Sequence, residues 1–199
     1  MIQIVLCDLN IVVVRAWEKF CGDLDFVSIR RGSILDVTCD AVVSPANSFG
    51  FMDGGVDAVY LNYFGAALEA RVQRTILTHH AGELVVGNAD IVETGNSKIP
   101  FLIIAPTMRV PMLLRESVNA YLAARAVFLL VQQGRFAAGS YRDEPVASRV
   151  KTIALPGFGT GVGQMGPNTS AHQMRQAIDD VILGEYTFPQ SWVAASQRH

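Results

Sequence analysis

The stretch that decides the fold is residues 155–166, which read LPGFGTGVGQMG. It follows a short apolar run, residues 152–155, that is typical of a buried strand, and a helical pattern begins near Pro167. When a strand, a glycine loop and a helix follow one another, backbone N–H groups can converge on an anion near the helix N-terminus. Glycine suits such a loop because it adopts positive φ at little cost and has no Cβ to block a phosphate. The stretch therefore predicts an anion-binding loop.

A second glycine-bearing stretch earlier in the chain has the same form. Residues 42–48 read VVSPANS and leave a predicted strand, residues 50–55 include three glycines, and a helix begins near Val56. Loops at the carboxyl ends of two strands can face each other across one crevice. We therefore expect the two loops to bind one diphosphate between them.

The composition is that of a chain with a large buried core. The 199 residues fit one domain or two small ones, and we expect a single domain over residues 1–199. Half of the residues are hydrophobic and 17% are charged, which argues against disorder. The formal net charge of −2 offers no basic field for nucleic acid. An anionic ligand must then be bound by amide dipoles.

Cysteine usage and the start of the chain indicate a cytoplasmic protein. The first residues lack a basic segment and meet an acid at Asp8, so they resemble a first strand rather than a secretion signal. Charged residues interrupt the best candidate for a membrane span. We expect no membrane partner, no metal and no cofactor. The three cysteines, whose odd number and spacing fit neither a metal site nor a CxxC motif, are expected to be reduced thiols: Cys7, Cys21 and Cys39.

The order of the predicted elements is β-α-β-β-α-β-β-α-β-α, which indicates an α/β fold with a mixed sheet between helices. Residues 134–150, rich in Gly, Ser, Arg and Asp, are expected to form an exposed loop. Gly65 is expected to split or kink the second helix. The predicted strands are residues 2–6, 26–29, 40–44, 84–92 (bent or in two pieces), 100–105 and 152–155, and the predicted helices are residues 13–20, 56–77, 113–133 and 167–181.

Two polar residues flank the first loop and are the candidates for chemistry. Asn47 lies just past a strand end, where a carboxamide can contact a sugar hydroxyl, or where it can simply form a turn. Asp57 lies in the first turn of the following helix, where a carboxylate can act in chemistry or merely complement the positive helix end. Asp53 is interpreted as a solvated loop acid.

Three motifs in this order resemble the macrodomain family, which binds ADP-ribose. They are SPANS at 44–48, GGVD at 54–57 and GTGV at 159–162, and the resemblance covers most of residues 32–182. It implies a three-layer α/β/α sandwich with a mixed central sheet.

The resemblance also implies roles for individual residues. Asn47 would contact the distal ribose, and Asp57 would be the carboxylate that takes part in hydrolysis. The other ligand-binding residues implied are Ser33, Ile34, Ala46, Gly54, Gly55, Val56, Gly159, Thr160, Gly161, Val162 and Gly163.

The chain departs from the family pattern at two of these positions. Ser33 stands where the family usually has an aspartate that holds the adenine amino group, and Gly163 stands where many hydrolytic members have an aromatic residue. Three hypotheses follow. The chain is a hydrolase that removes ADP-ribose from a modified substrate, a non-catalytic reader of ADP-ribose or ADP-ribosylated protein, or a partner-binding domain without a ligand.

Overall fold

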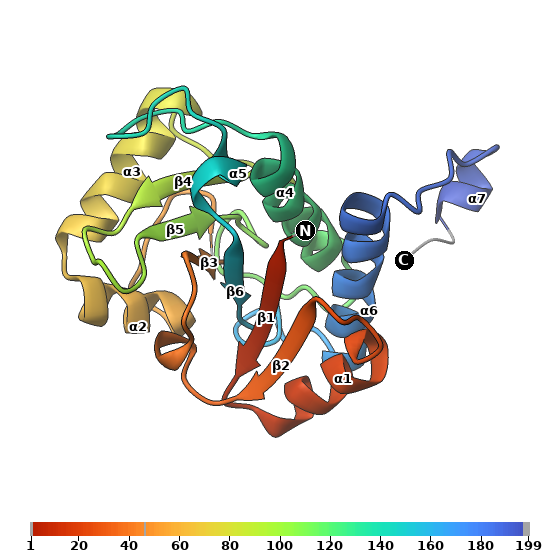
Figure 1. The fold of residues 1–199 in the computed structure, drawn as a ribbon. Helices are drawn as coiled ribbons and strands as arrows, with labels where there is room; N and C mark the ends of the chain where they lie inside the picture. Colours follow the sequence, from red (N-terminus) through yellow and green to blue (C-terminus); the bar gives the residue numbers. More distant parts are fainter. Residues whose placement is uncertain (1, 46, 197–199) are drawn as a thin grey trace.

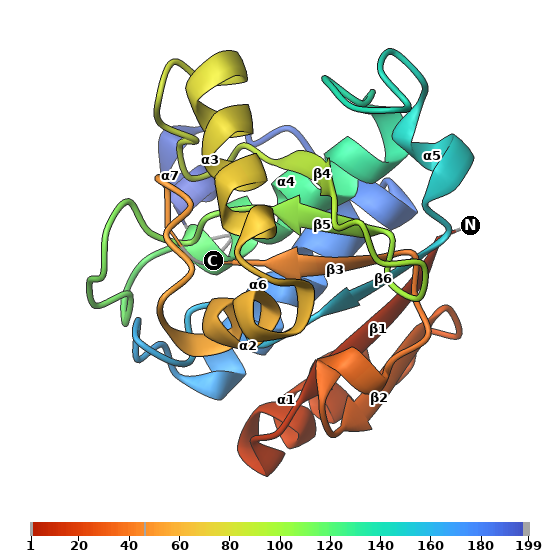
Figure 2. The ribbon, with the colours of Figure 1, turned by 90° about the vertical axis from the view of Figure 1, so that its left-hand side faces the viewer.

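The computed structural model describes residues 2–45 and 47–196 and is built on one six-stranded sheet with the order β2-β1-β6-β3-β5-β4. All neighbours pair in parallel except β4, which is antiparallel to β5. The carboxyl ends of the five parallel strands therefore meet at one edge of the sheet (Figure 2). The strands are β1 (Gln3–Asp8), β2 (Val27–Arg31), β3 (Ala41–Ser44), β4 (Asp90–Glu93), β5 (Phe101–Ile104) and β6 (Thr152–Leu155).

Helices cover both faces of the sheet, which confirms the predicted three-layer α/β sandwich with a mixed sheet. Figure 1 shows α2 and α3 on one face and α1, α4 and α6 on the other. The helical segments are α1 (Ile11–Cys21), η1 (Ile34–Asp36), α2 (Gly55–Phe64), α3 (Ala67–His79), α4 (Asn119–Gln133), α5 (Val146–Arg149), α6 (Pro167–Ala177), η2 (Ile178–Leu183) and α7 (Trp192–Ser196).

A separate apolar core lies on each side of the sheet. On the α2–α3 side, Tyr60 and Leu68 pack against Val42 of β3. On the other side, Trp17 of α1 and Phe128 of α4 are fully buried in the larger core. Strands β3 and β5 are buried along their whole length, which is why their sequences are almost continuously apolar. The two cores hold the strand ends that carry the site.

The helix predicted over residues 56–77 is split where Gly65 was expected to interrupt it. Gly65 has a φ of +86°, and its N–H still bonds to the carbonyl of Leu61, so α2 ends there and α3 begins two residues later. The break lets α3 run at a new angle over the same face of the sheet (Figure 1).

Two predicted boundaries are wrong because contacts distant in sequence override local pattern. Helix α4 begins at Asn119, not at residue 113. Leu114 instead donates its backbone N–H to the Gly163 carbonyl at 2.7 Å and is 1% exposed. The first part of the predicted strand 84–92 is also a loop, since Leu84 donates to the Ser48 carbonyl and only residues 90–93 join the sheet.

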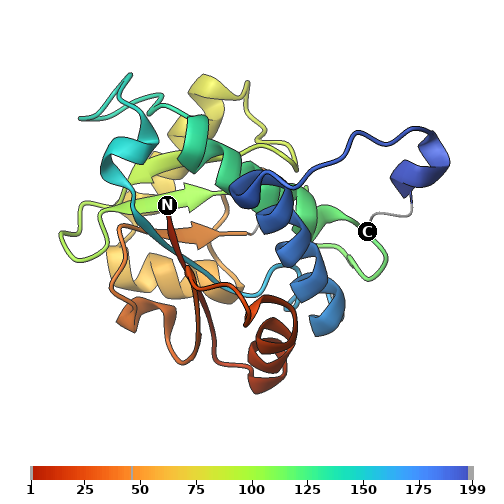
Figure 3. The same ribbon diagram turned by 45° about the vertical axis from the view of Figure 1, so that its right-hand side comes forward.

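Two further segments lie outside the sheet and the helices that cover it. Residues 134–150, expected to be an exposed loop, include α5 and bury the side chains of Phe136 and Val146. The segment after η2 extends from the body and ends in α7 (Figure 3). Within the described ranges, no helix combines the length and apolar character needed to cross a bilayer.

Candidate functional site

A cavity of about 480 Å³ opens at the carboxyl edge of the sheet. Asn47 of the first loop and Gly161 of the second both line it, so the two loops share one site. Ala46, also predicted for the site, lies outside the described residues. The other predicted residues all line this cavity: Ser33, Ile34, Gly54, Gly55, Val56, Asp57, Gly159, Thr160, Val162 and Gly163.

The first loop, residues 47–56, is folded on the side chain of Asn47. The Asn47 carboxamide oxygen accepts hydrogen bonds from the N–H groups of Phe49 (3.1 Å) and Phe51 (3.2 Å), and its nitrogen donates to the Phe51 carbonyl (2.8 Å). Glu69 of α3 accepts the Met52 N–H at 2.9 Å. The carboxamide is therefore a turn former in this structure, with its hydrogen bonds directed to its own loop.

Asp57 is a buried acid in the first turn of α2. It is 2% exposed, its Oδ1 has no hydrogen-bond partner among the described residues, and Ser44 of β3 hydrogen-bonds to its carboxyl group. Burial raises the pKa of Asp57 from 3.8 to about 7, against the lowering effect of the Ser44 hydrogen bond. A carboxyl group that titrates near neutral pH and has an unpaired oxygen beside a cavity is suited to proton transfer.

The second loop, residues 157–163, is held in place by two other parts of the chain. Asp8 at the end of β1 accepts the Gly157 N–H at 3.1 Å. Leu114 packs against Gly159 and Gly163, and a Cβ at Gly163 would come within 2.7 Å of the Gly159 carbonyl oxygen and 2.8 Å of Leu114. Gly163 is thus required by packing, and Gly159 by its φ of +69°.

Among the glycines of the two loops, two have no such structural requirement. A Cβ at Gly54 or at Gly161 would meet no atom within 4 Å, and neither residue has a positive φ. Both line the cavity, Gly54 at the start of α2 and Gly161 at the tip of the second loop. A side chain at either position would extend into open space, so glycine there leaves the backbone accessible to a ligand.

The cavity contains no cationic side chain among the described residues that line it, but three acids: Asp8, Asp53 and Asp57. The start of α2 compensates in part. Gly54 has no side chain with which to cap the helix, so the first N–H groups of α2 remain for a ligand. Helix N-termini carry partial positive charge and bind anions through these groups.

Sequence reasoning missed the part of the cavity wall that the N-terminal residues contribute. Cys7, Asp8, Leu9 and Asn10, at the junction of β1 and α1, all line the cavity. The signal was present, because Asp8 follows a predicted strand just as Asn47 does. Asn10 is also the N-cap of α1, where its side chain accepts the Val12 N–H at 2.9 Å.

Cys7 and Ser33, which both line the cavity, have clear local roles. Cys7 donates its thiol to the Gly32 carbonyl, and burial raises the pKa of that thiol, so it remains protonated rather than acting as a nucleophile. Ser33 accepts the Leu35 N–H at 3.3 Å as the cap of η1, directly beside Ile34 in the cavity wall.

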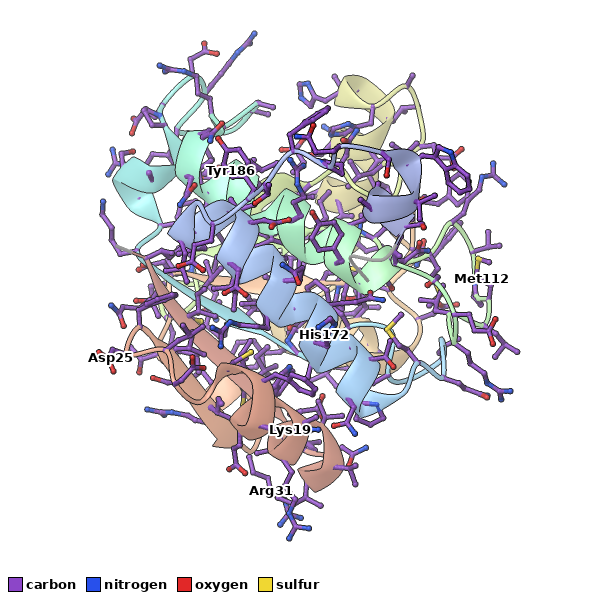
Figure 4. All side chains as sticks on the ribbon, turned by 90° about the vertical axis from the view of Figure 1, so that its right-hand side faces the viewer. Lys19, Asp25, Arg31, Met112, His172 and Tyr186 are labelled. Carbon is purple, nitrogen blue, oxygen red and sulfur yellow. The ribbon has the colours of Figure 1, made fainter. Side chains whose placement is uncertain are left out.

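Other residues that could be considered for chemistry lie elsewhere. Arg109 pairs with Glu83 at 2.6 Å, lies over the ring of Phe49 and is not part of the cavity wall. His172 is exposed on the outer side of α6, where its ring contacts Phe20 of α1 edge-on (Figure 4). His80 bonds to Asp90 of β4 at 2.9 Å.

The fold and cavity define a class of α/β protein that binds its ligand where parallel strands end, between glycine loops and a helix N-terminus. A family model, the Macro domain, matches residues 43–174. The chain belongs to the macrodomain family. The match begins inside β3, so β1, α1 and β2 precede the matched residues.

Known proteins resemble the chain in sequence and in fold. A protein of Aquifex aeolicus described as uncharacterized is 30% identical over 152 residues, which cover 76% of this chain and 80% of that protein. A solved mutant of the Oceanobacillus iheyensis macrodomain with ADPR has a TM-score of 0.59 and 20% identity, covering 74% of this chain and 73% of that one. The Trypanosoma brucei macrodomain in complex with ADP-ribose has a TM-score of 0.54 and 16% identity, covering 75% and 56%.

Proposed function

We propose that this macrodomain binds ADP-ribose in the cavity and hydrolyses the bond that joins ADP-ribose to a modified group. The observation that supports the proposal most is the pair of open glycines, Gly54 and Gly161, on two walls of a cavity without cations. Backbone amides at such positions can approach a diphosphate closely. Two family members of similar fold hold ADPR or ADP-ribose.

In the binding step, the diphosphate lies between the start of α2 and the tip of the second loop. The N–H groups of Gly55 and Val56 donate to one phosphate from the helix N-terminus, and those of residues 160–162 donate to the other. This arrangement directs the distal ribose towards the end of β3, where Asp57 lies. Binding energy from the diphosphate thereby positions the sugar for reaction.

In the hydrolytic step, ionised Asp57 accepts a proton from a water molecule that attacks the anomeric carbon of the distal ribose. A carbon–oxygen bond forms from the water, the bond from that carbon to the ester oxygen breaks, and the leaving group departs as a carboxylate. Asp57 then returns the proton to solvent. Positioned proton transfer of this kind contributes roughly 10²- to 10⁴-fold to a rate.

One observation favours the second candidate, a non-catalytic reader. Both polar atoms of the Asn47 side chain already bond to Phe49 and Phe51 of the same loop, so a contact with the distal ribose must replace or share one of those bonds. A reader would use Asn47 only to shape the loop. Turnover, not binding, distinguishes the two functions.

The test measures release of ADP-ribose from a peptide that carries it on a glutamate ester, together with ADP-ribose affinity by calorimetry. We expect Asp57→Asn to lower turnover by about 10²-fold or more. Affinity for ADP-ribose should be retained, because the substitution removes a negative charge that repels the diphosphate. Asp25→Asn is the matched control, since it removes an exposed acid outside the cavity. Wild-type turnover should rise with pH through about 7 as Asp57 ionises.

The outcomes separate the hypotheses. Binding without release by the wild-type protein selects the reader. Equal turnover of wild type and Asp57→Asn removes the acid from the mechanism. No measurable heat with ADP-ribose would overturn the proposal at its first step.

A further inference from the structure

One corner of the cavity is built by residues that precede the family match, and Asp8 is at its centre. The backbone carbonyl of Asp8 accepts the Gly32 N–H at 3.1 Å, which ties the end of β1 to the turn that carries Ser33. Its carboxylate accepts the Asn10 N–H on Oδ1 at 2.8 Å and the Gly157 N–H on Oδ2 at 3.1 Å. The acid is therefore fixed where three walls of the cavity meet.

The Asp8 carboxylate retains capacity to accept further hydrogen bonds. An ionised carboxylate offers about four acceptor sites, and the two N–H groups named above occupy two of them. The side chain is half-buried and lines the cavity. Gly157 makes the approach possible, because a Cβ there would lie 2.9 Å from Oδ2. A held acceptor thus faces the ligand space.

The chemistry of this corner matches the nucleoside end of the ligand rather than the diphosphate. A carboxylate repels a phosphate and attracts hydrogen-bond donors. Leu9 lines the same corner and is 72% exposed, and Ile34 lines it from the neighbouring turn. A flat base with an amino group needs apolar surface together with a fixed acceptor. Ser33 contributes no charge, and its oxygen already accepts the Leu35 N–H.

We propose that this corner holds the nucleobase and that Asp8 accepts a hydrogen bond from its exocyclic amine, so that Asp8 determines the preference for an amino base. The inference rests on the proposed function, because it assumes that a nucleotide occupies the cavity. Asp8 then takes the role that the family resemblance would give to an acid at position 33. The acid comes from a strand outside the matched region 43–174.

The test compares ADP-ribose with its hypoxanthine analogue, in which a carbonyl oxygen replaces the amine, by calorimetry on the full chain. Wild type should prefer ADP-ribose by roughly tenfold to a hundredfold, as expected for a hydrogen bond to a charged group. Asp8→Asn should bring the ratio of the two affinities to about one or invert it, since an amide can donate to the carbonyl. Adding Ser33→Asp to that variant should restore the preference.

Asp53→Asn is the matched control, because it removes an exposed charge from the same cavity. It should raise both affinities equally and leave their ratio unchanged. The readout is a ratio, so a general loosening of the loop at Gly157 does not imitate the expected result. Equal affinities in the wild-type protein, or an unchanged ratio in Asp8→Asn, would overturn the inference and leave the proposed function standing. Absence of binding to either compound would overturn both.

Discussion

The two loops that face each other across the cavity are held and opened in the same way and differ in the residues that follow them. Each is held in place by a side chain distant in sequence, Glu69 for the first loop and Asp8 for the second. Each presents to open space a glycine without a positive φ, Gly54 in the first loop and Gly161 in the second. Only the first loop leads into a buried acid, Asp57.

The difference suggests that holding the ligand and transforming it are separate tasks within one cavity. The second loop offers backbone amides and no titratable side chain, so changes there should alter affinity without altering pH dependence. The first loop leads to Asp57, whose ionisation near neutral pH should impose a pH dependence on stability and turnover alike. Substitutions on the two sides should therefore fail in different ways.

The largest expected effect is on stability, from Asp57→Asn. The pKa of Asp57 is about 7 in the folded protein and 3.8 ordinarily, so between about pH 4 and 7 the unfolded chain binds fewer protons than the folded one. The contribution of Asp57 to the free energy of unfolding then falls as pH rises, by about 1.4 kcal/mol per pH unit and about 4 kcal/mol in all. The variant loses this slope and should be the more stable protein above pH 7.

Urea denaturation at a series of pH values measures the difference. Asp25→Asn, at an exposed acid, should follow the wild-type curve. If the free energies of unfolding of wild type and Asp57→Asn changed with pH in parallel, Asp57 would be ionised at no cost in the folded protein. The two loops would then no longer differ in pH dependence.

Local pattern was enough to predict the loops, the strands that precede them and the split at Gly65. Glycine strings and apolar runs are signals within a few residues of one another. The contact of Asp8 with Gly157 joins residues 149 positions apart, and it depends on β1 lying between β2 and β6. No spacing rule encodes that strand order.

The hydrogen-bond partners of individual side chains could not be predicted from the sequence either. Asn47 could be placed at a strand end, but whether its carboxamide faces a ligand or its own loop depends on the path of residues 49–51. Likewise, the apolar spacing around Leu114 fits a helix, and only the Gly163 carbonyl that it bonds explains why the helix begins later. Tertiary contacts decide such cases.

The next effect in size is on binding, from Gly161→Val at the open tip of the second loop. The new side chain meets no protein atom near its Cβ and extends into the cavity, so it should exclude the diphosphate while the fold is kept. We expect ADP-ribose affinity to fall by about a hundredfold, or about 2.7 kcal/mol, with an unchanged melting temperature. Calorimetry and thermal unfolding measure the two quantities. A loss of stability in place of affinity would mean that Gly161 serves packing.

The smallest expected effect is on stability, from Gly163→Ala, and it contrasts Gly163 with Gly161 in the same loop. Gly163→Ala places a Cβ 2.7 Å from the Gly159 carbonyl oxygen and 2.8 Å from Leu114, contacts that backbone and side chain must relieve by moving. Overpacking of this kind costs about 1–3 kcal/mol, and we expect urea denaturation to show a loss of about 2 kcal/mol. Affinity should change less than in Gly161→Val, because the tip of the loop stays open. If Gly163→Ala instead abolished binding in a fully stable protein, Gly163 would belong with Gly161 to the ligand surface, and the division between a braced base and an open tip would not hold.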